Sequence, residues 1–292
     1  MKDFSLTTFK FLLTTLIKSS YTFSPFYKRN TGAPREIILR HDVDLKPQNA
    51  VAIAKIEEDL GLAGSFYFRI VPGSFDPAAI RKIASMGHET GYHYEDMNFA
   101  WAKLKAQGSG LRAQGEHLER QVADIGIGLF LNNLNDLRKI VPVKTICMHG
   151  SPMSRWDSRV LWKYYDYHDF GIIGEPYFDI NFDEVLYLTD TGRRWDGDSV
   201  NIRDLTTGDR RKTTEKFTAS PSFPLTLSAS YRFHSTFDII RAAEEGKLPD
   251  KIMMTFHPQR WTDNLLPWIK ELLWQNTKNQ VKYYIIRRRK NK

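Results

Sequence analysis

The segment Arg40-His41-Asp42-Val43-Asp44 places two carboxylates, an imidazole and a guanidinium directly after a short apolar run at residues 36–39. In an extended chain Asp42 and Asp44 point to the same face, so one could hold a cation while the other accepts a proton beside it. The same two acids could instead cap a following helix, which is the commoner use of a lone Asp-x-Asp. The segment alone therefore predicts either a cation site or a helix cap.

Histidines end three further runs that have the composition of strands: His93, His149 and His257. The carboxyl ends of parallel strands converge on one cavity, so we expect these imidazoles to meet Asp44 there. Histidine and carboxylate side chains are ligands for divalent ions such as Zn²⁺, Ni²⁺, Co²⁺ or Fe²⁺. Four polar strand ends together favour a divalent-metal site over four separate buried residues.

Strand-like and helix-like segments alternate along the chain, which is typical of a parallel sheet or barrel. Strands are predicted at residues 36–39, 65–71, 88–93, 144–149, 171–173, 185–188, 200–202 and 251–257. Helices are predicted at residues 47–60, 76–86, 111–140, 157–164, 237–245 and 265–274, the third of them divided at Gly126 and Gly128. Residues 205–217 are expected to form an exposed loop, and the apolar run 281–286 to close the fold as a last strand.

Length and composition predict a single α/β domain over residues 1–292. With 41% apolar and 13% aromatic residues the chain can bury a large core. Residues 1–35 are expected to form an N-terminal packing helix and lead-in, and residues 287–292 a basic tail. Cys147 is the only cysteine, which excludes an internal disulfide and a thiolate cluster, so a metal must be held by His and carboxylate side chains.

The net charge of +8 is concentrated near the C-terminus, where the basic tail supplies five of the eight charges. Such a tail is usually solvated, so we do not expect nucleic acid as a partner. The N-terminal apolar residues lie at helical spacing and are interrupted by Lys10, unlike a signal peptide. No run approaches the about 18 apolar residues of a spanning helix. These features predict a cytoplasmic protein and leave open a peripheral membrane contact by the N-terminal helix.

The segment Gly87-His88-Glu89-Thr90-Gly91-Tyr92-His93 resembles the Gly-His-Glu-x-Gly-x-His motif of the polysaccharide deacetylase family, the NodB-type carbohydrate esterases. The pair Asp42-x-Asp44 is similar to the family's acidic motif after the first strand, and Met254-Thr255-Phe256-His257 to its last motif. The resemblance runs from about residue 36 to residue 262. It implies an irregular (β/α)7 barrel.

The resemblance also implies roles for individual residues. Asp42 would be the catalytic base and His257 the general acid, while Asp44 and His93 would bind the metal. Many members place a second His four residues after the first, where this chain has Met97.

The third ligand is therefore assigned to His149, which begins a His-Gly-Ser-Pro turn of the kind that a subgroup of deacetylase-like proteins uses. Glu95 and Asp96, in the loop after His93, are the alternative oxygen ligands.

Supporting roles fall to residues around these motifs. The chain lacks the family's Arg-x-Pro-Tyr motif, so Arg40 or Arg155 is expected to steady the base. His88 is predicted not to bind the metal itself but to support the ligand His93 through a hydrogen bond. The predicted substrate contacts are Arg155, Trp195 and Arg193, with Trp156, Trp261 and Arg194 as further candidates for sugar stacking or an anionic group.

The reaction that the resemblance implies is hydrolysis of an N-acetyl group from a sugar by a metal-dependent enzyme of polysaccharide or O-antigen-type biosynthesis. The substrate would be a nucleotide-linked or lipid-linked sugar, or a glycan. Alternatives are another carbon–nitrogen hydrolysis on a sugar, such as deformylation, and a non-catalytic carbohydrate-binding pseudoenzyme. A third alternative is a basic surface protein that binds nucleic acid or membrane through its tail.

Overall fold

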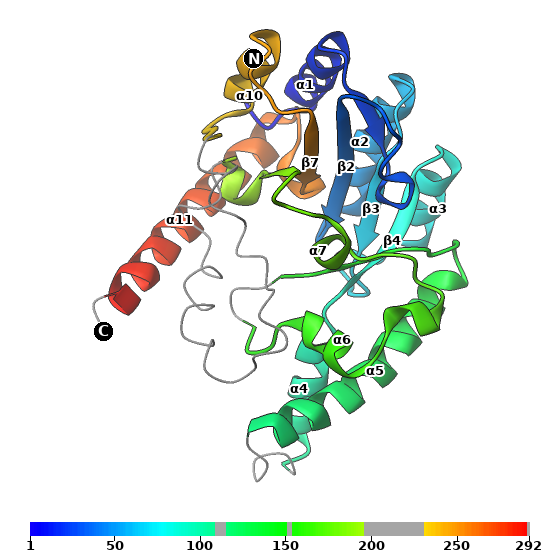
Figure 1. Ribbon diagram of the computed structural model, residues 1–292. Helices are drawn as coiled ribbons and strands as arrows, with labels where there is room; N and C mark the ends of the chain where they lie inside the picture. Colours follow the sequence, from blue (N-terminus) through cyan, green and yellow to red (C-terminus); the bar gives the residue numbers. More distant parts are fainter. Residues whose placement is uncertain (109–114, 151–153, 196–230, 291–292) are drawn as a thin grey trace.

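The computed structural model describes residues 1–108, 115–150, 154–195 and 231–290, and its strands form one parallel sheet (Figure 1). The order is β5-β4-β3-β2-β7-β6, and β1 pairs with the start of β2. The strands are β1 (Thr22–Ser24), β2 (Glu36–Val43), β3 (Ser65–Phe68), β4 (Glu89–Tyr94), β5 (Ile146–Met148), β6 (Leu186–Thr189) and β7 (Lys251–Phe256). The described strands form a curled sheet with β5 and β6 at its ends, as expected of a parallel α/β protein, whereas closure into a (β/α)7 barrel stays a prediction.

Helices lie beside this sheet, and most of them connect one strand to the next along the chain (Figure 1). They are α1 (Leu6–Lys18), α2 (Pro47–Asp59), α3 (Pro77–Ser85), α4 (Asp96–Ala106), α5 (Gly115–Arg138), α6 (Leu161–Tyr164), α7 (Pro176–Asp179), α10 (Thr236–Glu244) and α11 (Leu265–Lys290). Short 3₁₀ turns η4 (Thr191–Arg193) and η6 (Pro258–Arg260) follow β6 and β7. Local chemistry sets several starts: the Asp76 carboxylate accepts hydrogen bonds from the first turn of α3, and Pro77 occupies its first position.

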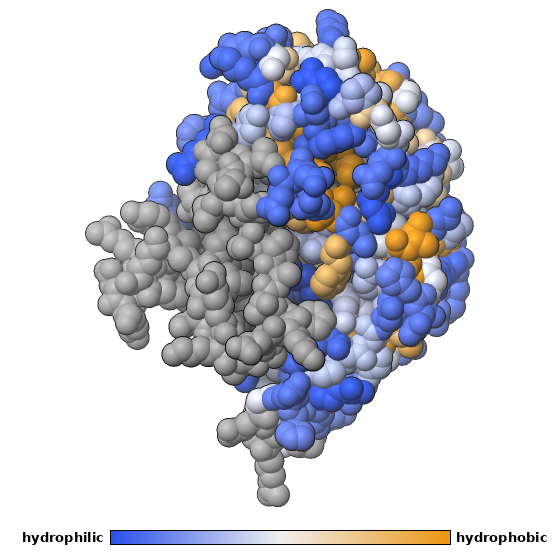
Figure 2. All heavy atoms as spheres, viewed as in Figure 1, coloured by the Kyte–Doolittle hydropathy of each residue, from blue (hydrophilic) through white to orange (hydrophobic). Residues whose placement is uncertain are grey.

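Strand β2 lies at the centre of the sheet, and all eight of its residues are buried. It pairs with β3 along one edge and with β7 along the other, and the burial of successive residues shows that both of its faces are covered, as is usual for parallel strands. Helix α1 packs against α10 and α2, and its Phe9, Leu12 and Leu13 are fully buried. The face shown in Figure 2 is mostly hydrophilic over its described residues, with apolar residues in a few patches.

Gly91 explains why β4 can lie so close to its neighbours. A Cβ atom at this position would fall 2.5 Å from the ring of Tyr67 in β3 and 2.8 Å from the carbonyl oxygen of Thr145. Only glycine lacks that atom. The glycine of the motif at residues 87–93 therefore sets the distance between β4 and the strands on either side, and with it the place of His93.

Three expected elements differ from the observed ones. Helix α5 runs unbroken through Gly126 and Gly128. Gly126 does not end the helix but lets Leu161 pack closely against it, since a Cβ atom there would lie 3.0 Å from Cδ2 of Leu161. Residues 171–173 are not a strand, and the chain makes only an isolated bridge beside them. The run 281–286 continues helix α11 instead of forming a strand. The expected strand at 200–202 and loop at 205–217 lie outside the described residues.

Candidate metal and proton-transfer site

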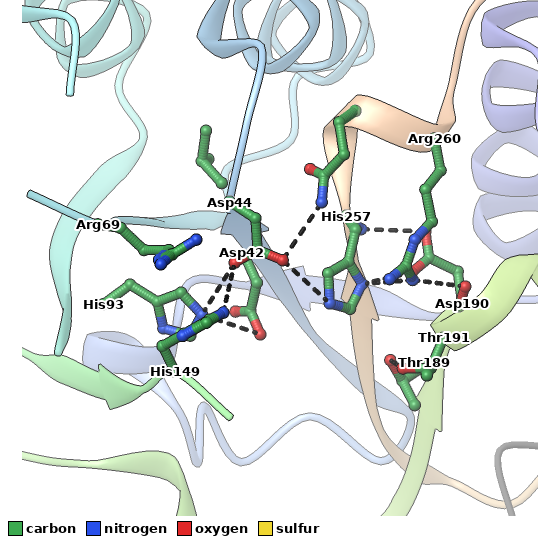
Figure 3. Close-up of polar contacts among 12 residues, drawn as sticks. Asp42, Asp44, Arg69, His93, His149, Thr189, Asp190, Thr191, His257 and Arg260 are labelled. Atoms are coloured by element: carbon green, nitrogen blue, oxygen red, sulfur yellow. Dashed lines mark hydrogen bonds and ion pairs between the residues drawn. The ribbon is translucent and has the colours of Figure 1, made fainter. Parts of the chain in front are cut away.

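Asp44, His93, His149 and His257 come together at the carboxyl ends of β2, β4, β5 and β7 (Figure 3). Asp44 Oδ1 lies 3.6 Å from His93 Nε2 and 3.4 Å from His149 Nε2. Its other oxygen, Oδ2, lies 3.9 Å from His257 Nε2. Residues separated by more than two hundred positions thus surround one carboxylate, which is the convergence expected of parallel strand ends.

The side chains of Asp44, His93 and His149 fit a divalent metal ion. One ligand atom from each lies within 4.8 Å of the others, which suits ligands placed about 2.0–2.2 Å from a shared zinc ion. Asp44 Oδ1 is buried and has no hydrogen-bond partner, a costly state that a cation would relieve. Burial raises the pKa of Asp44, but the three imidazoles, His149 foremost, outweigh it and hold the carboxyl below its usual range.

A second group, Asp42 with His93 and Cys147, has similar spacing. Arg40 already donates a hydrogen bond to each oxygen of Asp42, from Nε at 2.8 Å and from Nη2 at 2.7 Å. A cation at this second position would lie beside that guanidinium and be repelled by it. The geometry therefore favours Asp44 over Asp42 as the carboxylate ligand.

Hydrogen bonds fix the orientation of both ligand imidazoles. His93 Nδ1 lies 2.9 Å from the carbonyl oxygen of Cys147, and His149 Nδ1 lies 3.1 Å from Glu95 Oε2. Each contact engages the nitrogen that faces away from Asp44, which leaves Nε2 directed toward Asp44 and available to a metal ion. Burial lowers the pKa of His93 to about 4, so its imidazole is neutral at pH 7, as a ligand must be.

The two alternative oxygen ligands have other partners. Glu95 orients His149 through Oε2 and accepts a hydrogen bond from Arg69 Nε at Oε1, 2.6 Å away. Asp96 is fully buried in the first turn of α4 and accepts hydrogen bonds from Tyr92 and Asn133. Burial raises the pKa of Asp96 to about 7. Glu95 is thus a partner of a ligand, and Asp96 is directed away from the cluster.

Arg40 holds Asp42 in one orientation beside this cluster, in the supporting role predicted for it. The guanidinium is fully buried, and Asp42 Oδ2 lies 3.8 Å from His93 Nε2. Burial raises the pKa of Asp42, but the Arg40 charge outweighs it and holds the pKa well below the usual range. Asp42 is therefore ionised and able to accept a proton, although the ion pair makes it a weaker base.

His257 is held from its far side by Asp190, the residue after β6. The distance from His257 Nδ1 to Asp190 Oδ1 is 2.5 Å. Arg260 Nη1 and Trp261 Nε1 also donate to this buried carboxylate, at 2.8 and 2.7 Å. Burial raises the pKa of Asp190, but Arg260 and His257 outweigh it and keep the group ionised. Asp190 was not among the predicted site residues, although it follows the predicted strand at 185–188 and fits the rule of polar strand ends.

The prediction that His88 supports His93 is wrong, because the two side chains lie in different parts of the protein. His88 Nε2 is 2.9 Å from the Ala54 carbonyl oxygen, and Nδ1 accepts a hydrogen bond from the Gly64 amide at 3.1 Å. His88 shares its buried surroundings with Glu57, which also lies 2.8 Å from His41. These contacts tie α2 to the sheet.

The structure also argues against Trp195 and Arg193 as substrate contacts. Trp195 is 3% exposed, packs on Phe256 and donates to Thr236, so no ring face is open to a sugar. Arg193 is 7% exposed and donates to the carbonyl oxygens of Trp268 and Asp3.

The four other predicted substrate contacts also have protein partners. Trp261 is fully buried in the same core as Trp195. The guanidinium of Arg155 lies over Trp101, 4.6 Å from the ring centroid, and also faces Trp156. Arg194 lies 3.2 Å from His234. The described contacts of these side chains are therefore structural ones.

Comparison with family models, with curated proteins and with solved structures found no significant match to this chain. Among the described residues, no helix is sufficiently long and apolar to span a bilayer.

Proposed function

We propose that this protein is a metal-dependent hydrolase that removes the acetyl group from an N-acetylated sugar. The observation that carries the proposal is the arrangement around Asp44, where two oriented imidazoles complete a metal-ligand set. A carboxylate, Asp42, lies on one side of that set and an imidazole, His257, on the other. Metal-assisted hydrolysis of an amide uses these parts: an ion, a proton acceptor and a proton donor.

The reaction would begin with removal of a proton from water. A bound divalent ion supplies Lewis-acid chemistry, which polarises an acyl carbonyl and makes water a stronger acid. Asp42 accepts the proton as the water oxygen adds to the acyl carbon, and the oxygen facing His93 is placed for this. The ion pair with Arg40 weakens Asp42 as a base, so the acidity of the water must compensate.

The reaction would end with breakage of the carbon–nitrogen bond. His257 donates the proton on Nε2 to the departing amine, which leaves as the free amino sugar while the acyl group leaves as acetate. The ionised Asp190 fixes the other nitrogen and so orients the ring. Arg260 and Trp261 in turn fix Asp190, so the proton donor is held by a rigid set of contacts.

The choice of an acetylated sugar is supported by the resemblance of residues 36–262 to the polysaccharide deacetylases. From the same resemblance we propose that the sheet closes into a (β/α)7 barrel and that Zn²⁺ is the preferred ion. We also propose that the enzyme is cytoplasmic and acts on a nucleotide-linked or lipid-linked sugar.

Metal analysis and acetate release together test the proposal. The purified protein should bind one divalent ion, and Asp44→Asn or His93→Ala should lose it, whereas His168→Ala on the exposed turn after α6 should not. The loaded protein should release acetate from a panel of N-acetylated sugar nucleotides. Release of formate alone from N-formylated sugars would identify a deformylase. Sugar binding without ion or hydrolysis would identify a pseudoenzyme and overturn the proposal.

A further inference from the structure

Helix α11 extends from the body of the protein toward the C-terminus (Figure 1). Its 26 residues correspond to about 39 Å at 1.5 Å per residue. The helix is fixed to the turn η4 near its start and at its middle: Arg193 Nη1 donates to the Trp268 carbonyl oxygen at 3.0 Å, and Asn279 Nδ2 donates to that of Gly192, also at 3.0 Å. The helix face that meets the protein therefore includes polar contacts.

The opposite face of the first turns of α11 exposes several apolar side chains, beside exposed polar residues such as Lys270 and Thr277. Leu266 is 80% exposed, Leu273 62% and Trp274 55%, and Leu265 and Ile269 are exposed as well. Positions 266, 269 and 273 follow the spacing of one helical stripe. Gln275, by contrast, is buried on the inner face. Soluble proteins ordinarily bury such an apolar stripe, so an exposed one marks an interaction surface.

The same helix carries nearly all of the chain's net charge. Residues 265–292 contain eight Lys and Arg residues and one acidic residue, Glu271, whereas the whole chain has a net charge of +8. The segment is also rich in Trp and Tyr, which concentrate at the boundary between water and lipid. Cationic charge, interfacial aromatic residues and an exposed apolar stripe on one helix are the features of helices that lie on anionic membranes.

We propose that α11 docks this protein on a membrane surface rich in anionic phospholipids. The apolar stripe would enter the boundary between headgroups and acyl chains, and the Lys and Arg residues would pair with lipid phosphates. A second copy of the chain would cover the stripe but would bring a second concentration of like charge. A nucleic acid would match the charge but leave the leucines exposed. This proposal is independent of the hydrolase proposal.

Co-sedimentation of the full-length protein with lipid vesicles tests the docking. The protein should sediment with vesicles of phosphatidylcholine and phosphatidylglycerol in equal parts, not with phosphatidylcholine alone, and binding should weaken as salt rises. The double change Leu266→Gln and Leu273→Gln should weaken binding by about tenfold or more, because both side chains leave the lipid. The control is Ile173→Gln, which changes an apolar residue that is 50% exposed outside α11 and should leave vesicle binding unchanged.

A second variant separates charge from folding. Removal of residues 287–292, which lie at and beyond the end of α11, should weaken binding to the anionic vesicles while metal content stays unchanged. No sedimentation with anionic vesicles, or equal sedimentation with phosphatidylcholine, would overturn the proposal. A dimer in sedimentation equilibrium that the double leucine variant abolishes would assign the face to a second copy instead. Tail-dependent retention on DNA without vesicle binding would assign it to nucleic acid.

Discussion

His257 and Asp190 come from adjacent strands, and their side chains meet with 2.5 Å between Nδ1 and Oδ1. The main-chain amide of His257 donates to the other oxygen of the same carboxylate, 3.0 Å away. Asp190 thus holds both the backbone and the ring of His257. A proton donor fixed in this way keeps its Nε2 directed at Asp44 and at whatever binds there.

Asp190→Asn should therefore impair proton donation without loss of the metal ion. We expect acetate release to fall by about a hundredfold or more, the usual contribution of a positioned acid. The measurement is kcat for acetate release alongside metal content. Asp169→Asn, an exposed acid, is the control, and an unchanged kcat in Asp190→Asn would contradict the assigned role.

Glu95→Gln should weaken metal binding by about 10- to 100-fold, the range found when the partner of a ligand imidazole is changed. The carboxylate fixes Nδ1 of His149 and is itself paired with Arg69. Competition with a chelating dye would measure the affinity for Zn²⁺. Glu184→Gln, at an exposed acid near the start of β6, should bind zinc like the parent protein. Equal affinity of the Glu95 variant would contradict the orienting role assigned to Glu95.

Arg40→Met should destabilise the fold by roughly 3–5 kcal/mol, because it leaves the buried Asp42 charge without its partner. Asp42→Asn in the same chain should recover much of that loss, since the remaining side chain is neutral. Urea unfolding of the single and double variants measures both effects. A single variant as stable as its parent would mean that Asp42 takes up a proton or a solvent contact at little cost.

Asp96 should make stability depend on pH near neutrality. Its pKa is about 7 in the folded state and about 4 in the unfolded chain, so the folded protein binds the extra proton between these values. This contribution to stability is fully present below about pH 4 and is lost as pH rises through about 7. Asp96→Asn should flatten the decline in stability between about pH 4 and about pH 7 in urea unfolding. An identical decline in both proteins would refute the shift.

The sequence allowed good prediction of the strands and of the residues at their ends. The run at 36–39, His93, His149 and His257 could be placed because parallel strands bury apolar runs and deliver polar residues at one edge. Asp190 follows the predicted strand 185–188 and could have been found by the same reasoning.

The wrong predictions concern contacts with distant parts of the chain. Arg193 and Trp195 stand in a polar segment that looks exposed, but Phe4 and Trp268, from the two ends of the chain, cover Arg193. His88 lies near His93 in sequence, yet its ring packs with α2. The run 281–286 has strand composition, but the helix that begins at Leu265 continues through it.

The pairing of β2 with β7 has a consequence for synthesis on the ribosome. Glu36 and Lys251 stand opposite each other in the register, 215 residues apart. During translation the central strand therefore emerges long before the partner for one of its edges exists, and an unpaired strand edge invites aggregation. A nascent chain stopped before residue 251 should be a better client for chaperones than the finished protein.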